Sequence, residues 1–388
     1  MSKIEKEIDL FLKNESDNIF KNFENIVNIN SFSNNIEGIK KVYDYLTDMA
    51  EGYGIKLEEI YSTKKARPHL MYQRDLNENF YALIGHVDTV HPPQSDFDHI
   101  IEKDGHYIGP GTNDMKSGII VALYSLILLQ KIYPDRKLPI KILFNSDEEI
   151  GSFDSKEIIQ SEFKNALAGF VFEAGRLPGN QIVTGRKGVF NIDINIEGKP
   201  SHAGVAPQNG INAISAACEI IQKLHQLNNF EKGTTIGCNV IKGGVAVNVV
   251  APFCKIEVDG RFVTQNDGNE VLKKIDEILK RPNSVGAKVN YEIPHLRPPM
   301  ERSKKGEELY HKYKEVSNSL GIECSETSTG GGSDANFLSA MGIPALDGLG
   351  AVGNYSHTKK EFTIKNSITD RIKIFTMFMN GLIENSWR

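Results

Sequence analysis

The chain contains few cysteines, and their spacing does not suggest a site. The four residues, Cys218, Cys238, Cys254 and Cys324, include no CxxC pair. This spacing argues against a disulfide framework and against a zinc site built from thiolates. We therefore expect free, buried thiols, and any metal would have to be bound by histidine and carboxylate side chains.

Long apolar runs and an excess of positive charge are also missing. No apolar stretch reaches the roughly 20 residues that a membrane-spanning helix needs. The N-terminus, Met1–Glu7, is charged and lacks the apolar core of a signal peptide. The 45 basic and 50 acidic residues give a net charge of -5, which argues against nucleic-acid binding. We expect no membrane or nucleic-acid partner and a cytoplasmic location.

What the chain does contain is an ordinary globular composition over a length that suits two domains. Of its 388 residues, 40% are hydrophobic and 24% are charged, as in soluble globular proteins. A chain of this length most often forms more than one domain. There are no internal repeats and no low-complexity tracts.

Apolar strands alternate with helices over most of the chain. Amphipathic spacing predicts helices over Ile4–Ile29 and Asn35–Met49, and an apolar helix over Ser117–Ile132. The other expected elements are strands at Ile55–Ile60, His69–Gln73, Phe80–Val87, Lys137–Asn145 and Ala168–Phe172, and helices at Lys304–Leu320 and Ser367–Glu384. Such alternation predicts a mostly parallel sheet with helices on both faces.

The pattern changes near Gly185. From Val189 to Ile196 every second residue is apolar, and the following segments read as helix, strand, strand, helix and strand up to about Ile293. This βαββαβ order predicts a small ferredoxin-like unit with helices on one face of its sheet. We interpret it as an inserted second domain, which ends before Pro298-Pro299.

Five candidate metal ligands follow predicted strands or lie in loops. They are His86, Asp114, Glu149, Glu173 and His357. The carboxyl ends of parallel strands share one edge of a sheet, where ligands bind in open α/β folds. Carboxylate and imidazole ligands suit zinc, cobalt or manganese, and one shared carboxylate is able to bridge two ions.

Glu148 and Glu149 are adjacent and therefore point in different directions on an extended chain. One of them is expected to bind metal while the other accepts a proton from a metal-bound water. The alternative is a solvated acidic turn at a helix start, stabilised by the helix dipole.

Four stretches of the chain resemble the motifs of one enzyme family. The stretches are His86-Val87-Asp88, Gly111-Thr112-Asn113-Asp114-Met115-Lys116, Asp147-Glu148-Glu149-Ile150-Gly151-Ser152 and Gly198-Lys199-Pro200-Ser201-His202-Ala203-Gly204. They look like the family of zinc metallopeptidases and deacylases that includes acetylornithine deacetylase, succinyl-diaminopimelate desuccinylase and carboxypeptidase G. Thr329 to Ala335, with its triple glycine, is most similar to the glutamate carboxypeptidase branch, whereas Gly185-Arg186-Lys187-Gly188 looks more like the general peptidase and deacylase branches.

The resemblance implies an α/β zinc-peptidase catalytic domain with a mixed, mostly parallel sheet, formed by residues 1–185 and 298–388. Residues 186–297 would form an inserted ferredoxin-like α+β lid and dimerisation domain. It also implies two zinc ions per chain, for which cobalt or manganese substitutes. Asp114 would bridge the ions. His86 and Glu173 would complete the shell of one ion, and Glu149 and His357 that of the other.

The resemblance also implies roles for residues that do not bind metal. Glu148 would be the general base, and Asp88 would orient His86. His202 would stabilise the oxyanion, in family members often from a partner subunit. Asn248 and Arg261 would grip the substrate, and backbone amides at Gly331 and Gly332 would meet its carboxylate. The alternatives are a plain loop histidine at 202, a surface ion pair at Arg261 and a flexible turn at the triple glycine.

Taken with the resemblance, the sequence predicts a homodimeric dizinc hydrolase of a small peptide or N-acyl amino acid. A glutamate-carboxypeptidase-like exopeptidase is the first hypothesis. The alternative is an N-acyl amino acid deacylase of the acetylornithine deacetylase or succinyl-diaminopimelate desuccinylase type. A catalytically silent binding protein on the same scaffold would require a lost ligand or base, and none of the six residues is missing. The side chain or acyl group of the substrate is not specified by the sequence.

Overall fold

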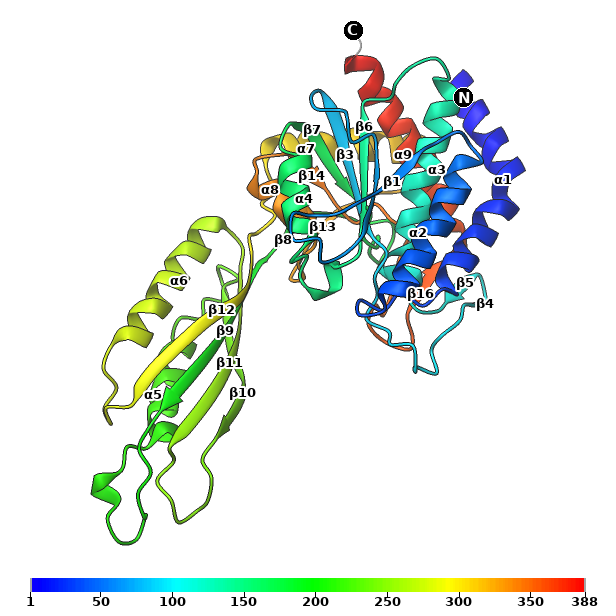
Figure 1. Ribbon diagram of the computed structural model, residues 1–388. Helices are drawn as coiled ribbons and strands as arrows, with labels where there is room; N and C mark the ends of the chain where they lie inside the picture. The colour runs from blue at the N-terminus through cyan, green and yellow to red at the C-terminus, as the bar shows by residue number, and fades with distance from the viewer. Residues whose placement is uncertain (1, 387–388) are drawn as a thin grey trace. The chain divides into compact units, whose positions relative to one another are not determined.

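The computed structural model describes residues 2–386, which form two compact units (Figure 1). Unit 1 combines residues 1–185, 302–328 and 333–388, and unit 2 combines residues 186–301 and 329–332. Unit 2 thus contains the segment that the sequence assigns to an inserted domain. Its role as a lid and dimerisation domain stays a prediction, and residues 1 and 387–388 of the predicted catalytic domain lie outside the described residues.

Unit 1 is built on a six-stranded sheet in the order β1-β2-β6-β3-β7-β14. Its strands are β1 (Leu57–Ile60), β2 (His69–Tyr72), β3 (Phe80–His86), β6 (Ile140–Asn145), β7 (Ala166–Val171) and β14 (Ala345–Leu346). β6, β3, β7 and β14 run parallel, whereas β1 and β2 are antiparallel to their neighbours. Every residue of β3 is buried, as expected for a central strand covered on both faces. The predicted mixed, mostly parallel sheet is confirmed.

Helices cover both faces of this sheet. One face packs against α1 (Lys3–Val27), α2 (Ile36–Glu51), α3 (Ser117–Ile132), α7 (Lys304–Ser319) and α9 (Lys365–Ser386) in one apolar core. The rings of Phe375 and Phe378 on α9, for example, meet Phe170 of β7 at 5.5 and 5.4 Å. The other face carries α4 (Ser155–Glu162) and α8 (Ala335–Ala340), where Leu338 lies directly over Gly169 of β7.

The stretch Thr112–Ile132, which ends with α3, is long and apolar enough to cross a membrane by length and composition alone. It extends the apolar helix predicted at Ser117–Ile132 to 21 residues, whereas no apolar run was expected to reach roughly 20 residues. However, 83% of the most apolar 18-residue segment of this stretch is buried inside the protein. α3 packs against β3, α1 and α9, and a helix that is apolar on all sides is suited to such a central position.

Short strands that the sequence did not predict form a second sheet in unit 1, in the order β15-β16-β5-β4. They are β4 (Ile101–Lys103), β5 (His106–Ile108), β15 (Gly353–Asn354) and β16 (Phe362–Ile364). Strands of two or three residues are too short to show an alternating pattern. This sheet brings residues 353–364 beside residues 106–108. β8 (Ile182–Arg186) and β13 (Glu326–Thr329) form a separate two-stranded sheet.

Unit 2 has the predicted βαββαβ order and the ferredoxin-like strand arrangement β10-β11-β9-β12, antiparallel throughout. Its elements are β9 (Gly188–Glu197), α5 (Ala213–His225), β10 (Thr235–Gly243), β11 (Phe253–Phe262), α6 (Gln265–Lys280) and β12 (Lys288–Arg297). Alternate residues of β9, from Phe190 to Ile196, pack with apolar residues of α5 and α6 in a core of their own.

The start of α4 is not capped by the side chain of its N-cap residue, Asp154. Instead, Asp147 Oδ2 accepts hydrogen bonds from the backbone N–H groups of Asp154 (2.7 Å) and Ser155 (3.2 Å).

The prediction that all four cysteines are buried was wrong. They are free, but only Cys254 and Cys324 are buried. Cys238 is half-buried and Cys218 is exposed, because Cys218 lies on the outer side of α5.

Candidate metal centre

The carboxyl ends of three neighbouring strands carry four of the predicted site residues. His86 is the last residue of β3, and Glu148 and Glu149 lie in the short 3₁₀ helix η2 (Glu148–Ile150) just after β6. Glu173 follows the end of β7 by two residues. Since β3 pairs in parallel with both β6 and β7, these ends meet at one edge of the sheet.

Asp114 lies between two histidines. It belongs to the turn η1 (Thr112–Lys116), which precedes α3 and whose backbone is non-helical at Asp114 and Met115. Its Oδ1 is 3.2 Å from His86 Nε2, and its Oδ2 is 3.2 Å from His357 Nε2. His357 comes from the loop between β15 and β16, and its Nε2 is also 3.1 Å from Glu149 Oε2. Each oxygen of Asp114 therefore faces a different imidazole.

Glu173 and Glu148 complete the cluster on the His86 side. Glu173 Oε1 is 3.6 Å from His86 Nε2. Ligand atoms of His86, Glu148 and Glu173 lie within 4.8 Å of one another, as do those of His86, Asp114 and Glu149. The structure thus brings together all five predicted ligands and the predicted base, whose individual roles stay predictions.

Asp88 contacts the backbone of Glu148 and Glu149 as well as His86. His86 Nδ1 is 3.0 Å from the Asp88 backbone oxygen and 3.5 Å from the carboxylate. The carboxylate accepts hydrogen bonds from the backbone N–H groups of Glu148 (3.2 Å) and Glu149 (3.3 Å) and from the Ser33 hydroxyl (2.8 Å). One fully buried carboxylate thereby links the β3 end to η2.

Asp334 supports the same turn from α8. Ser152 donates its hydroxyl to Asp334 Oδ1 at 2.6 Å, and the side-chain amide of Asn145 donates to Asp334 Oδ2. Asn145 ends β6, and Ser152 follows η2 with a positive φ of 54°. The residues before and after Glu148 and Glu149 are therefore bound to one buried side chain.

The charges in the cluster shift its titration strongly. Burial alone would lower the pKa of His86, but the carboxylates of Asp114, Asp88 and Glu173 raise it well above its ordinary value. Hydrogen bonds to Asp114 and Glu149 raise the pKa of His357 to about 11. Burial and the charge of Asp114 raise the pKa of Glu149 to about 8. The carboxylates thus attract positive charge, which protons or metal cations are able to supply.

The donor set also suits a metal on geometric grounds. Glu149 Oε1 is buried and has no hydrogen-bond partner among the described residues, although buried polar atoms are normally satisfied. Two imidazole nitrogens and several carboxylate oxygens converge on one place, a set that suits zinc, cobalt or manganese. The residues present therefore fit a metal centre.

The predicted lid residues His202 and Asn248 lie in two neighbouring loops of unit 2. Ala203 N donates to Asn248 O at 2.9 Å, and His202 forms a β-bridge with Val249. Both His202 and Asn248 are exposed. Two loops that are almost fifty residues apart in the sequence thus pair with each other. The substrate roles of His202 and Asn248 stay predictions.

Arg261 forms an ion pair, which was the expected alternative to a role in substrate binding. Its Nε and Nη2 are 3.0 and 2.9 Å from the two carboxylate oxygens of Asp259, and Nη1 donates to Gly330 O at 3.2 Å. A two-pronged bond to Asp259 orients the guanidinium. A substrate carboxylate would have to share Arg261 with Asp259 or displace it.

The triple glycine is held by a second arginine. Arg186 Nη1 donates to the backbone oxygens of Gly331 (3.2 Å) and Gly332 (3.3 Å). The Cα of Gly332 faces the Arg297 side chain so closely that an added Cβ would come within 2.7 Å of it. The turn therefore has specific contacts, and the proposed use of its amides for a substrate carboxylate stays a prediction.

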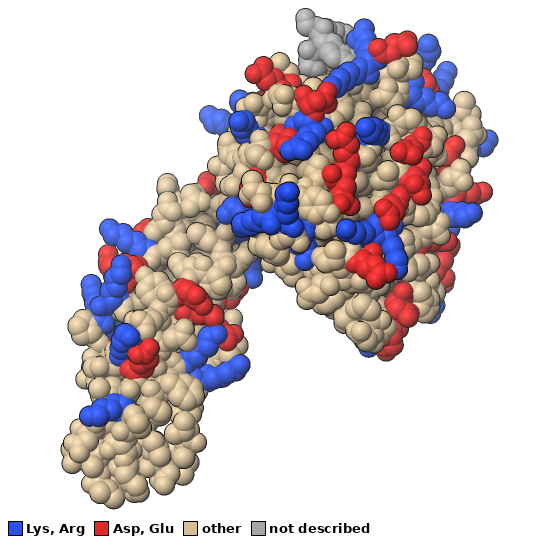
Figure 2. Space-filling model, viewed as in Figure 1, with Lys and Arg blue, Asp and Glu red and all other residues tan. Residues whose placement is uncertain are grey.

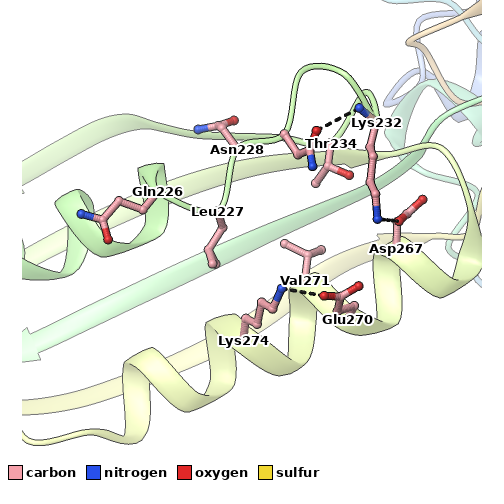
Figure 3. Close-up of a pocket in the computed structure, with 10 residues that line it drawn as sticks. Gln226, Leu227, Asn228, Lys232, Thr234, Asp267, Glu270, Val271 and Lys274 are labelled. Atoms are coloured by element: carbon pink, nitrogen blue, oxygen red, sulfur yellow. Dashed lines mark hydrogen bonds and ion pairs between the residues drawn. The ribbon is translucent and has the colours of Figure 1, made fainter.

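A pocket of about 200 Å³ in unit 2 is separate from these residues (Figure 3). It lies between the end of α5 and the start of α6, beside the ion pairs Lys232–Asp267 (3.7 Å) and Lys274–Glu270 (2.6 Å). None of the predicted site residues lines it. Its lining has neither the histidines nor the converging carboxylates of the metal cluster.

Sequence reasoning missed Ser33 and Glu361, whose side chains contact Asp88 and the backbone of Asp114. Ser33 bonds to Asp88, as described above. Glu361 accepts hydrogen bonds from the backbone N–H groups of Asn113 and Asp114, both at 2.9 Å. Glu361 stands four residues after His357, next to the unpredicted strand β16, so recognising that strand would have been the signal for it.

Comparisons with known proteins identify the family of this chain. Residues 82–381 match the model of peptidase family M20/M25/M40. Carboxypeptidase G2 of Pseudomonas sp. (strain RS-16) is 28% identical over 91% of this chain and 86% of its own length. A succinyl-diaminopimelate desuccinylase of Hydrogenovibrio crunogenus is 27% identical over 77% of this chain and 82% of its own length.

Solved structures show the same fold. The aminopeptidase PepT from Bacillus cereus superposes with a TM-score of 0.77 at 22% identity, over 95% of this chain and 98% of that one. A metallo-carboxypeptidase of the M20 family from Sulfolobus solfataricus gives a TM-score of 0.75 at 18% identity, over 93% and 98% of the two chains. With a family match that spans most of its length, the chain belongs to peptidase family M20/M25/M40 and is a metal-dependent hydrolase of the peptidase and deacylase type.

Proposed function

We propose that this protein is a dizinc exopeptidase of the glutamate carboxypeptidase type. The observation that carries the proposal is the position of Asp114, whose two carboxylate oxygens each face a different histidine at 3.2 Å. A bridging ligand for two ions needs this arrangement. The similarity to carboxypeptidase G2 along 91% of the chain supports this choice of substrate class.

The residues around Asp114 divide into two ligand sets. His86 and Glu173 would hold one zinc ion, and Glu149 and His357 the other. When bound, the zinc ions would polarise the substrate carbonyl and lower the pKa of a bound water toward about 7. The three ligand carboxylates, Asp114, Glu149 and Glu173, supply negative charge that offsets most of the positive charge of the two cations.

Glu148 is the proposed proton carrier. A carboxylate oxygen of Glu148 lies within 4.8 Å of ligand atoms of His86 and Glu173. The buried Asp88 carboxylate accepts a hydrogen bond from the backbone N–H of Glu148. Glu148 takes the proton of the attacking water and passes it to the amide nitrogen that leaves as an amine. The water oxygen and its second proton become part of the new carboxyl group, which releases this proton on ionising at neutral pH, so protons and atoms balance.

Unit 2 is proposed to be the lid and the dimerisation domain. The outer side of α5 presents Ile214, Cys218 and Ile221, spaced as one row on a helix, and Ile214 and Cys218 are exposed. Val205 and Val247, in the loops of His202 and Asn248, are 77% and 104% exposed. The end of unit 2 that carries these loops shows no charged side chain in Figure 2. A second copy of the chain would cover such a surface and would place His202 at a neighbouring active site.

A deacylase is the second candidate function. The desuccinylase of Hydrogenovibrio crunogenus is almost as similar as carboxypeptidase G2, at 27% against 28% identity. The metal cluster serves both reactions equally, because each breaks an amide bond next to an amino acid. The difference lies in the groups that recognise the rest of the substrate.

Two measurements test the proposal. Elemental analysis of protein purified without chelator should find about two zinc ions per chain, and chelator should abolish activity that zinc or cobalt restores. Turnover should then be compared between dipeptides with C-terminal glutamate, N-acetylornithine and N-succinyl-diaminopimelate. Full activity in metal-free protein would contradict the metal mechanism, and a preference for the acyl substrates would favour the deacylase.

A further inference from the structure

Glu361 provides a cap for the turn that carries Asp114. η1 is not a regular helix, because Asp114 and Met115 have non-helical φ and ψ angles, so its backbone N–H groups need acceptors from elsewhere. Gly111, which precedes η1, has no side chain that could accept from them. Glu361, from a distant part of the sequence, replaces it: its Oε1 accepts from Asn113 N and Asp114 N, both at 2.9 Å.

The other oxygen of Glu361 is also engaged. Oε2 lies 3.0 Å from His91 Nε2, and His91 in turn packs its ring against Phe97. Glu361 is 1% exposed and His91 is 7% exposed. The carboxylate is thus fixed from two sides in a place that water does not reach, which makes its hydrogen bonds strong and directional.

The segment around Glu361 is bound to η1 along its length. Thr363 Oγ1 donates to Thr112 O at 2.7 Å, and Asn113 Nδ2 donates to Ser356 Oγ at 2.8 Å. His357 lies in this same segment. These bonds therefore connect the loop that carries Asp114 to the loop that carries His357.

We propose that Glu361 is a positioning residue that fixes the Asp114 carboxylate relative to His357. The proposal rests on the metal function proposed above. Glu361 itself touches neither metal ligand side chain in the described structure. It acts through the backbone N–H of Asp114, and the buried carboxylate is directed to that N–H by His91.

Three substitutions separate this role from general stabilisation. Glu361→Ala removes the acceptor and should weaken zinc binding roughly 10–100-fold, as the loss of groups that support metal ligands does elsewhere. Glu361→Asp keeps the charge but shortens the side chain, so it should also weaken binding. Glu361→Gln keeps the length and one acceptor oxygen for both N–H groups. Its NH₂ group is able to donate to His91 Nε2 when the imidazole adopts the tautomer with Nε2 unprotonated, so this variant should bind zinc nearly as well as the unmodified protein.

Glu162→Ala is the matched control. Glu162 also lies in unit 1 and accepts bonds from Lys141 (3.0 Å) and Arg74 (3.1 Å), but none from a residue of the metal cluster. Its loss should lower stability to urea without changing zinc affinity. A shared loss of zinc affinity in Glu162→Ala and Glu361→Ala would show that general destabilisation is sufficient and would overturn the proposal.

Zinc affinity is measured by competition with a chromophoric chelator, which does not depend on activity. The visible spectrum of the cobalt-substituted protein gives a second measure, since it reports ligand geometry. We expect altered cobalt bands in Glu361→Asp and unaltered bands in Glu361→Gln. If Glu361→Ala and Glu361→Asp both match the unmodified protein in affinity and spectrum, Glu361 has no positioning role. A failure of the unmodified protein itself to bind metal would instead contradict the proposed function.

Discussion

The Asp88 carboxylate accepts a hydrogen bond from the backbone N–H of Glu148 at 3.2 Å. Asp88 follows β3, and Glu148 follows β6, so this bond joins the ends of two neighbouring strands. The same carboxylate also accepts from Glu149 N and lies 3.5 Å from His86. The proposed base and two proposed ligands are therefore oriented by one side chain.

Asp88→Asn should weaken both metal binding and catalysis. An amide offers one acceptor oxygen, and its NH₂ group cannot accept from the second backbone N–H. We expect zinc affinity and turnover to fall roughly 10–100-fold, measured by chelator competition and steady-state kinetics. Asp75→Asn makes the same chemical change at an exposed pair with Lys137 and should leave both unchanged. Normal zinc binding in Asp88→Asn would show that its hydrogen bonds are dispensable.

Glu148→Gln should separate catalysis from metal binding. Glutamine preserves the size of the side chain but cannot take a proton from water. Turnover should fall roughly 10²–10⁴-fold, while zinc content stays at the level of the unmodified protein. Glu149→Ala should instead reduce zinc content, and Glu157→Gln on α4 should do neither. If Glu148→Gln turned over substrate at nearly the normal rate, another group would have to be the base.

Gly118→Ala should destabilise unit 1 even though alanine favours helices. A Cβ at residue 118 of α3 would stand 1.9 Å from Phe172 O, a backbone atom that cannot rotate away. Overpacking of this kind typically costs about 1–3 kcal/mol, measured by urea unfolding. Gly381→Ala in α9 is the control, because a Cβ there meets nothing within 4 Å. That change should raise stability by about 0.5–1 kcal/mol. Equal effects of the two substitutions would contradict the steric explanation.

Cys238 should react slowly with thiol reagents at neutral pH. Burial raises the pKa of its thiol to about 11, and only the thiolate reacts. Since pH 7 to 10 lies below that pKa, its alkylation rate should rise about tenfold with each pH unit over this range. Mass spectrometry of timed samples measures the rate, and Cys238→Ser identifies the peptide. A rate that levels off below pH 9 would show that the thiol titrates earlier.

Mixed dimers test whether His202 acts across subunits. Glu148→Gln and His202→Ala chains should each be inactive as pure samples. If His202 serves the partner's site, a mixed dimer contains one site with both an intact base and an intact histidine, and activity should return. No recovery, once subunit exchange has been confirmed, would mean that His202 serves its own chain or has no catalytic role. Ile214→Lys, in the apolar row of α5, should lower the dimer fraction in sedimentation experiments.

The strands and helices with strong periodic patterns were predictable from the sequence. Phe80–Val87 was expected as a buried central strand, and β3 is Phe80–His86. The helix expected at Ser117–Ile132 has those same bounds. The ferredoxin-like order of unit 2 followed from the alternation that begins at Val189. These elements were recognisable because burial of one face, or of both, imposes a regular spacing of apolar residues.

Contacts set by short strands and single polar bonds were not predictable. β16 has three residues and no detectable pattern. Its pairing with β5 nevertheless brings the adjacent Glu361 within hydrogen-bond distance of the Asp114 backbone. For Arg261 the sequence offered an ion pair as an alternative, but it did not identify Asp259 as the partner. The ligand types were recognisable from the motifs, whereas their support depends on pairings between residues up to about 250 positions apart.

The three-segment composition of unit 1 has a consequence for its synthesis. α3 is almost wholly buried and packs against α9, which follows all of unit 2 in the sequence. Unit 2 and its separate core are translated before α9 and before His357. A nascent chain therefore exposes the apolar surface of α3 until α9 has been translated, and apolar surface that is exposed during synthesis is prone to aggregation. The proposed metal centre is complete only after His357 has been translated, which follows the whole of unit 2 in the sequence.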